Sequence, residues 1–280
     1  MKTLLTGARV IDQSQNLDRV TDVLIEDGKI AKIGALLKSG AVKKFEPDFS
    51  VLDLKGMILV PGLIDMHTHF RDPGFEYKET VESGSAAAAA GGFTAVACMA
   101  NTNPINDNRA VTEYIIRKAR TCGLVRVYPV GAISIGLKGA NLAEYGDMKA
   151  AGVVALSDDG KPVMNSHLMR MALEYAGSLH LPVISHAEDA DLSAEGLMHE
   201  GMVSTELGLP GIPAIAEEAM IARDILLADY TRTAIHIAHV STRGSVALIR
   251  DAKARGICVT AETAPHYFTF SEECLREFDT

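Results

Sequence analysis

The sequence has no surplus of basic residues, few cysteines and no long apolar run, and each shortage excludes a class of protein. Its 280 residues carry a formal net charge of −9 at pH 7, which argues against a nucleic-acid-binding surface. The 4 cysteines form no C-x-x-C pair, as expected for reduced thiols in the cytoplasm. No run is long enough to span a bilayer, and the N-terminus lacks the pattern of a signal peptide. These absences predict a cytoplasmic protein without a membrane segment, whose partners are small molecules or proteins.

Apolar residues, in contrast, make up 48% of the chain, which is enough for a substantial core. The first 60 residues contain short strand-like runs bounded by turn residues, with Asp27-Gly28 as a hairpin turn. We expect these strands at residues 4–10, 23–25, 29–33, 51–54 and 57–60. The pattern predicts a small β-domain over residues 1–60, the N-terminal part of a β-sandwich.

From residue 61 onward, apolar strands alternate with amphipathic helices. We expect strands at residues 63–69, 94–100, 125–133, 153–159, 182–188, 234–240 and 258–263. Helices are expected between them, at residues 78–90, 109–122, 142–151, 166–179, 213–229 and 241–255. Such alternation indicates an α/β fold with a parallel sheet, and seven units in a row favour a (β/α)8 TIM-like barrel over residues 61–280. Because the sequence ends at Thr280 without an eighth strand, this barrel is expected to be truncated before strand 8.

Polar side chains follow the carboxyl ends of these strands, where a barrel of this kind forms its active site. Side chains alternate along a strand, so His67, His69 and Arg71 are expected on one face. The later strand ends carry Asn101, Asp158, Asp159, His186, Glu188, His239 and Glu262. Four histidines and one carboxylate suffice for two divalent ions, and this combination of ligands favours zinc. Arg71 is suited to binding a substrate carboxylate through its two-pronged guanidinium.

Some of these positions leave alternatives open. Only one of Asp158 and Asp159 can face the metals on a regular strand, and a carboxylated Lys161 is a less favoured bridge. His236 and His239 are separated by an odd number of residues, so they cannot both face inward on a regular strand. We favour His239 as the ligand, which leaves His236 outward or behind the ligands.

Two more polar residues have a local alternative. Asn101 either contacts the substrate or forms an Asx-turn before Pro104. His266 lies beyond the seventh strand and is expected to be structural rather than catalytic.

Together, these motifs resemble those of the dihydroorotases, a family of the metal-dependent amidohydrolase superfamily. Residues 61–69, PGLIDMHTH, resemble the opening signature of the superfamily, and residues 70–74, FRDPG, are similar to its dihydroorotase form. Matching blocks follow in order at residues 101–104, 157–160, 185–189, 239–242 and 262–267. The resemblance extends over the chain from about residue 2 to residue 280.

The resemblance implies a metal centre and a reaction. His67 and His69 would bind one zinc ion, His186 and His239 a second, and Asp159 would bridge the two. His69, Arg71 and Asn101 would contact the substrate. The reaction would be the reversible, zinc-dependent cyclisation of N-carbamoyl-L-aspartate to L-dihydroorotate in de novo pyrimidine biosynthesis.

In the family, an aspartate at the end of strand 8 serves as general acid and base, and that residue is absent from this chain. The 280-residue chain is therefore expected to be inactive without the missing C-terminal part. Two alternatives remain open: another cyclic-amide hydrolase, such as an allantoinase or hydantoinase, and a non-catalytic scaffold subunit of aspartate carbamoyltransferase. Besides the small-molecule substrate, the expected partners are aspartate carbamoyltransferase and further copies of the chain in a homo-oligomer.

Overall fold

A computed structural model describes residues 1–36 and 49–277 of the chain. The chain divides into two compact units, Met1–Leu63 and Ile64–Thr280. Among the described residues, no helix is both long and apolar enough to cross a membrane.

The first unit is a five-stranded sheet built around β1 (Lys2–Asp12). β1 lies antiparallel to β2 (Leu17–Glu26) and parallel to both β4 (Phe49–Asp53) and β5 (Ile58–Leu59). β2 turns into β3 (Lys29–Gly34) through Asp27-Gly28, and both turn residues have positive φ, as two-residue hairpins often require. The predicted strands are confirmed. The described residues of this unit form one sheet, so the second layer of the sandwich stays a prediction.

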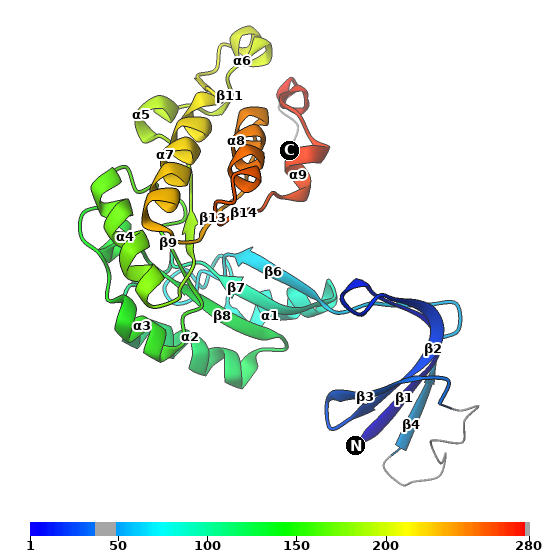
Figure 1. Ribbon diagram of the computed structural model, residues 1–280. Helices are drawn as coiled ribbons and strands as arrows, with labels where there is room; N and C mark the ends of the chain where they lie inside the picture. Colours follow the sequence, from blue (N-terminus) through cyan, green and yellow to red (C-terminus); the bar gives the residue numbers. More distant parts are fainter. Residues whose placement is uncertain (37–48, 278–280) are drawn as a thin grey trace. The chain divides into compact units, whose positions relative to one another are not determined.

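The second unit contains a curved, seven-stranded parallel sheet whose strand order follows the chain (Figure 1). The strands are β6 (Leu63–Thr68), β7 (Phe93–Cys98), β8 (Arg126–Gly131), β9 (Ala155–Ser157), β10 (Val183–Ser185), β13 (Ile235–Ile237) and β14 (Val259–Ala261). Each strand lies beside its neighbours in this list, so β6 and β14 are the two edges. The seven predicted strand positions are confirmed, although the later strands are shorter than expected.

Helices connect successive strands, as the sequence predicted. They are α1 (Val81–Ala90), α2 (Arg109–Cys122), α3 (Tyr145–Ala151), α4 (Ser166–Ser178), α7 (Ile215–Thr231) and α8 (Arg243–Ala254). In four of them, the side chain of the N-cap residue accepts a hydrogen bond from a backbone N–H of the first turn. This contact marks the point where the loop ends and the helix begins. These N-cap residues are Thr80, Asn108, Asn165 and Thr242.

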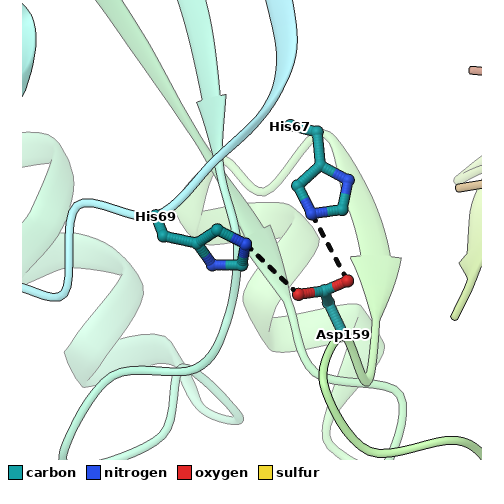
Figure 2. Close-up of side chains that lie close together, drawn as sticks. All are labelled: His67, His69 and Asp159. Atoms are coloured by element: carbon teal, nitrogen blue, oxygen red, sulfur yellow. Dashed lines mark ion pairs between the residues drawn. The ribbon is translucent and has the colours of Figure 1, made fainter. Parts of the chain in front are cut away.

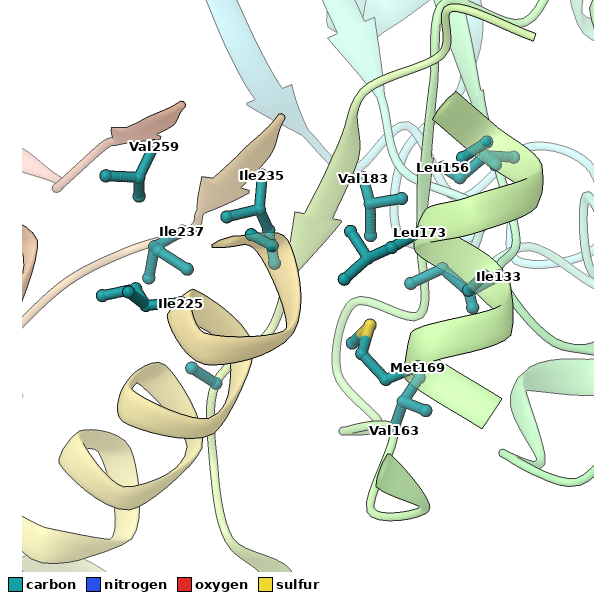
Figure 3. Close-up of a cluster of buried hydrophobic side chains, with 14 of the residues drawn as sticks. Ile133, Leu156, Val163, Met169, Leu173, Val183, Ile225, Ile235, Ile237 and Val259 are labelled. Atoms are coloured by element: carbon teal, nitrogen blue, oxygen red, sulfur yellow. The ribbon is translucent and has the colours of Figure 1, made fainter. Parts of the chain in front are cut away.

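The main core lies between the strands and helices α4, α7 and α8 (Figure 3). Leu156, Val183 and Ile235 occupy the same register position on three adjacent strands, so their side chains form one row. Leu173 of α4 and Ile225 of α7 belong to the same buried cluster. Residues of the opposite parity therefore face the interior of the curved sheet, where the polar side chains gather.

The segment between β10 and α7 contains short elements that the sequence did not reveal. They are α5 (Ala190–Ser193), β11 (Met198–His199), α6 (Met202–Leu207) and β12 (Gly211–Ile212), with β11 and β12 paired in parallel. Further short elements are η1 (Gln13–Gln15), η2 (Ile135–Leu137), α9 (Pro265–Thr269) and η3 (Glu272–Leu275).

Candidate metal centre

Asp159 follows β9, and its carboxylate lies between histidines from several strands. Nε2 of His67 is 3.3 Å from Oδ1, and Nε2 of His69 is 3.4 Å from Oδ2. Figure 2 shows the two imidazoles directed at different oxygens of this carboxylate. Because His67 lies on β6 and His69 just beyond it, the alternation of the strand brings both rings to the same carboxylate.

Two further histidines approach Asp159 from β10 and β13. Nδ1 of His186 and Nε2 of His239 each lie 3.4 Å from Oδ1, and these two nitrogens are 2.7 Å apart. Asp159 is thus shared by two groups of donors, one with His67 and His69 and one with His186 and His239. Within each group, the donor atoms all lie within 4.8 Å of one another, so each can hold a metal ion.

The Asp159 carboxylate itself supports a metal at this position. Its Oδ1 atom is buried and accepts no hydrogen bond from the described residues. An unsatisfied buried carboxylate oxygen is costly, and bound cations would remove that cost. Burial raises the pKa of Asp159, but His186, His239 and His67 lower it more, so the group stays ionised. An ionised carboxylate surrounded by imidazole nitrogens is a donor set that suits zinc and similar divalent ions.

His67 and His69 differ in their second contacts. Burial lowers the pKa of His67, but Asp159 and Glu262 raise it more, to about 9. A metal must therefore displace a proton from His67 at neutral pH. For His69, burial is the main cause that lowers the pKa, and the charge of Arg71 adds to it. Nδ1 of His69 lies 3.0 Å from Oδ1 of Asn101, which leaves Nε2 directed toward Asp159.

Asp158 and Lys161 lie apart from the histidines. Asp158 accepts the backbone N–H groups of Ile133 and Ser134 at 2.8 and 2.9 Å, together with the hydroxyl of Ser134. Lys161 is exposed. The structure therefore brings Asp159, rather than either alternative, to the four imidazoles.

The donors face a cavity of about 740 Å³. Its walls include Glu188, Glu217, His266 and Tyr267 besides the donor residues. His266 is exposed at the first turn of α9, and its ring lies 4.4 Å from that of Tyr267.

The proposed substrate contacts lie near His69. Arg71 has a left-handed backbone with φ of 60°, and its guanidinium has no hydrogen-bond or ion-pair partner within the described part of the chain. The amide of Asn101 contacts His69, and its Nδ2 lies 3.4 Å from the backbone oxygen of Asp159. The side chain of Asn101 therefore lies beside His69 and Asp159, at the edge of the candidate metal centre.

The sequence predicted no role for Glu262 and only an indirect one for His236. Oε1 of Glu262 lies 2.5 Å from Nδ1 of His67, and Oε2 lies 3.4 Å from Nε2 of His236. His236 pairs in register with Ile184, so it faces the interior rather than outward. The odd separation from His239 does not prevent this, because β13 ends at Ile237 and His239 adopts a φ of 40°. The sequence placed Glu262 at a strand end, just beyond β14, but no motif or spacing links it to His67.

Comparison with known proteins supports the resemblance. The protein family described as Dihydro-orotase-like matches residues 56–245. A dihydroorotase of Syntrophus aciditrophicus (strain SB) is 62% identical over 280 residues, which are 100% of this chain and 65% of that protein. A dihydroorotase of Syntrophotalea carbinolica is 57% identical, with a match covering 100% of this chain and 64% of that protein. The chain thus spans slightly less than two thirds of the length of these relatives.

Solved structures with the same fold are hydantoinases. L-Hydantoinase (dihydropyrimidinase) from Arthrobacter aurescens matches with a TM-score of 0.79 at 22% identity, over 97% of this chain and 60% of that chain. A D-hydantoinase matches with a TM-score of 0.78 at 24% identity, over 99% and 60% of the two chains. At this level of identity the likeness shows the fold alone. It confirms the TIM-like barrel architecture.

Proposed function

Since the chain belongs to the dihydro-orotase-like family, we propose that the protein catalyses the reversible cyclisation of N-carbamoyl-L-aspartate to L-dihydroorotate. The observation that carries this proposal is a single carboxylate, Asp159, shared by two pairs of histidines at the mouth of the sheet. The relatives named dihydroorotase and the FRDPG segment at residues 70–74 support the same substrate.

We propose that two zinc ions occupy this centre, one held by His67 and His69, the other by His186 and His239, and both by Asp159. The orphaned Oδ1 atom of Asp159 and the nitrogen donors around it support this assignment. When bound, such ions lower the pKa of water and polarise a carbonyl group, as hydrolysis of a cyclic amide requires.

The residues beside the centre would orient the substrate. The unpaired guanidinium of Arg71 suits bidentate binding of the substrate carboxylate, with Asn101 and His69 beside it. In the family that the chain resembles, an aspartate at the end of strand 8 donates the proton to the leaving nitrogen. We propose that the reaction needs such a group in addition to the residues described above.

The proposal extends to the setting of the protein. We propose a cytoplasmic homo-oligomer with aspartate carbamoyltransferase as its protein partner. The resemblance supports these assignments. The negative net charge bears on another point, since it does not favour nucleic acid as a partner. Co-purification of the natural-length protein with the transferase, followed by size determination, tests both.

Turnover by the natural-length protein tests the reaction. We expect ring opening of L-dihydroorotate, with allantoin and hydantoin hydrolysed far more slowly. Arg71→Lys should raise KM more than it lowers kcat, because an ammonium group cannot form the two parallel hydrogen bonds of a guanidinium. Preferential hydrolysis of allantoin or hydantoin would assign the protein to another cyclic-amide hydrolase. Stable binding to the transferase without zinc or turnover would favour a scaffold subunit.

A further inference from the structure

We propose that Glu262, supported by His236, is a positioning residue that orients His67 and so sets the affinity of one of the two metal sites. This inference rests on the proposed metal centre. It concerns residues that lie behind the ligands, and it predicts that the two sites respond differently to the same substitution.

The contact between Glu262 and His67 determines which nitrogen of the imidazole can bind a metal. Oε1 of Glu262 lies 2.5 Å from Nδ1 of His67, while Nε2 of His67 faces Asp159 at 3.3 Å. A hydrogen bond from Nδ1–H to Glu262 would leave the lone pair of Nε2 for a metal. A carboxylate in this position also makes the ligating nitrogen more basic.

Glu262 also lies close to a second histidine. Nε2 of His236 lies 3.4 Å from Oε2 of Glu262 and forms no hydrogen bond with the described residues, whereas Nδ1 of His236 lies 2.8 Å from Oγ1 of Thr260. Thr260 and His236 are register partners on β14 and β13, so the sheet itself brings these two side chains together. His236 is only 8% exposed. The row Thr260, His236, Glu262 and His67 thus runs from the edge strand to the centre.

Within the described residues, the other histidine ligands have no comparably buried carboxylate behind them. His69 contacts the neutral amide of Asn101. Nε2 of His186 lies 3.3 Å from Glu188, whose side chain is 39% exposed, whereas that of Glu262 is 16% exposed. A charge–charge contact in a less exposed position is less screened by water, so the Glu262 contact should be the stronger one.

Site selectivity follows from the way the donors are grouped. His67 belongs to the group with His69 and Asp159, and the group with His186 and His239 does not include it. Loss of the Glu262 charge should therefore lower the affinity for one metal ion and leave the affinity for the other nearly unchanged. A general loss of folding would weaken both.

The test is a zinc titration of the natural-length protein, freed of metal and competed with a chromogenic chelator. Glu262→Gln keeps the size of the side chain and removes its charge. We expect one site to lose about 10- to 100-fold in affinity and the other to keep its wild-type value. Glu188→Gln is the matched control, with an expected change of at most about fivefold because its carboxylate is more exposed.

Two backgrounds identify the weakened site. His239→Asn leaves only the His67 group intact. In this background, Glu262→Gln should lower the zinc affinity of the remaining site by the same factor as in the otherwise wild-type protein. In His69→Asn, which leaves only the His186 group intact, it should change little. Equal weakening in both backgrounds, or no weakening in either, overturns the proposal.

A further variant covers the case in which Glu262→Gln does not fold. His236→Gln leaves Glu262 in place, and we expect a smaller loss confined to the same site. Unchanged affinity in a folded His236→Gln variant would remove His236 from the proposal. Because the titration needs no substrate, a wild-type protein that binds zinc but does not open L-dihydroorotate contradicts only the proposed reaction. A wild-type protein that binds no zinc contradicts the metal centre itself and this inference with it.

Discussion

Asp158 and Asp159 are consecutive residues, yet their carboxylates lie in different surroundings. Asp158 receives the backbone N–H groups of Ile133 and Ser134 after β8, whereas Asp159 faces four imidazoles. β9 ends at Ser157, so both acids lie just beyond the strand, at the mouth of the sheet. One acid therefore joins β9 to the neighbouring loop and holds the other in place.

Asp159→Asn should remove metal from both sites, because Asp159 belongs to both donor groups. The asparagine side chain is uncharged, and its NH₂ group replaces one of the two carboxylate oxygens that would bind metal. We expect the metal content of the purified protein to fall from two ions per chain to nearly none. Retention of two ions, measured by elemental mass spectrometry, would rule out Asp159 as the shared ligand.

Asp158→Asn should lower the free energy of unfolding rather than the metal content. The amide places an N–H₂ group where Asp158 now accepts hydrogen bonds, and a lost partner for a buried donor costs about 1–3 kcal/mol. We expect denaturant unfolding of the metal-free protein to show this loss, with metal content maintained once the protein is folded. Loss of metal equal to that of Asp159→Asn would show that the two acids do not have separate roles.

Removal of one partner of a buried ion pair on α7 should be strongly destabilising. Asp224 is fully buried, accepts the hydroxyl of Ser185 at 2.5 Å and lies 2.7 Å from Nη2 of Arg223. Asp224→Ala leaves that guanidinium largely buried without its charge partner, and we expect a loss of about 3–5 kcal/mol in denaturant unfolding.

Asp229 on the same helix provides the control for Asp224. It pairs with Arg232, which is 85% exposed, and with Arg255, which is 50% exposed, so Asp229→Ala should cost less than about 1 kcal/mol. Similar losses for the two alanine variants would contradict the importance of burial.

Lys118 should give a stability difference that depends on pH. Its Nζ lies 2.6 Å from Oδ2 of Asp72, and the hydrogen bond with this buried carboxylate raises the pKa of Lys118. A lysine with a raised pKa stabilises the fold fully below its unfolded value of 10.5, and this contribution disappears as the pH rises through the folded value.

Lys118→Met should therefore cost about 1–3 kcal/mol at pH 7, less than for a fully buried pair because Lys118 is 31% exposed. We expect the difference from wild type to shrink when unfolding is measured above pH 10.5. An exposed lysine, Lys253, changed to Met in the same way, controls for general effects of alkaline pH. A difference that stays constant from pH 7 to pH 11 would contradict the ion pair as its source.

The order of elements in the barrel could be predicted from the sequence because each unit has a long periodic helix and an apolar strand. The helix at residues 109–122 was predicted with the boundaries it has as α2. The segment from Ala190 to Ile212 could not be predicted, because its helices and strands are too short for periodicity to show. Several strands end earlier than expected, since apolar residues continue into the loops.

The candidate site was predictable as far as strand ends determine it. Parallel strands present their carboxyl ends on one edge, so histidines distant in sequence had to converge there. The pairing of Glu262 with His67 could not be predicted, because it depends on how far the sheet curves between its two edge strands. The interior position of His236 depends on its register with Ile184, which residue spacing alone does not give.

The central claim is that a zinc centre built on Asp159 opens L-dihydroorotate. We would first measure the turnover of L-dihydroorotate by the natural-length, metal-free protein as zinc is added. The account predicts that activity rises with zinc, reaches its maximum at two ions per chain, and is absent in Asp159→Asn at every zinc concentration. Full activity without zinc, or a fully loaded protein that hydrolyses hydantoin but not L-dihydroorotate, would contradict it.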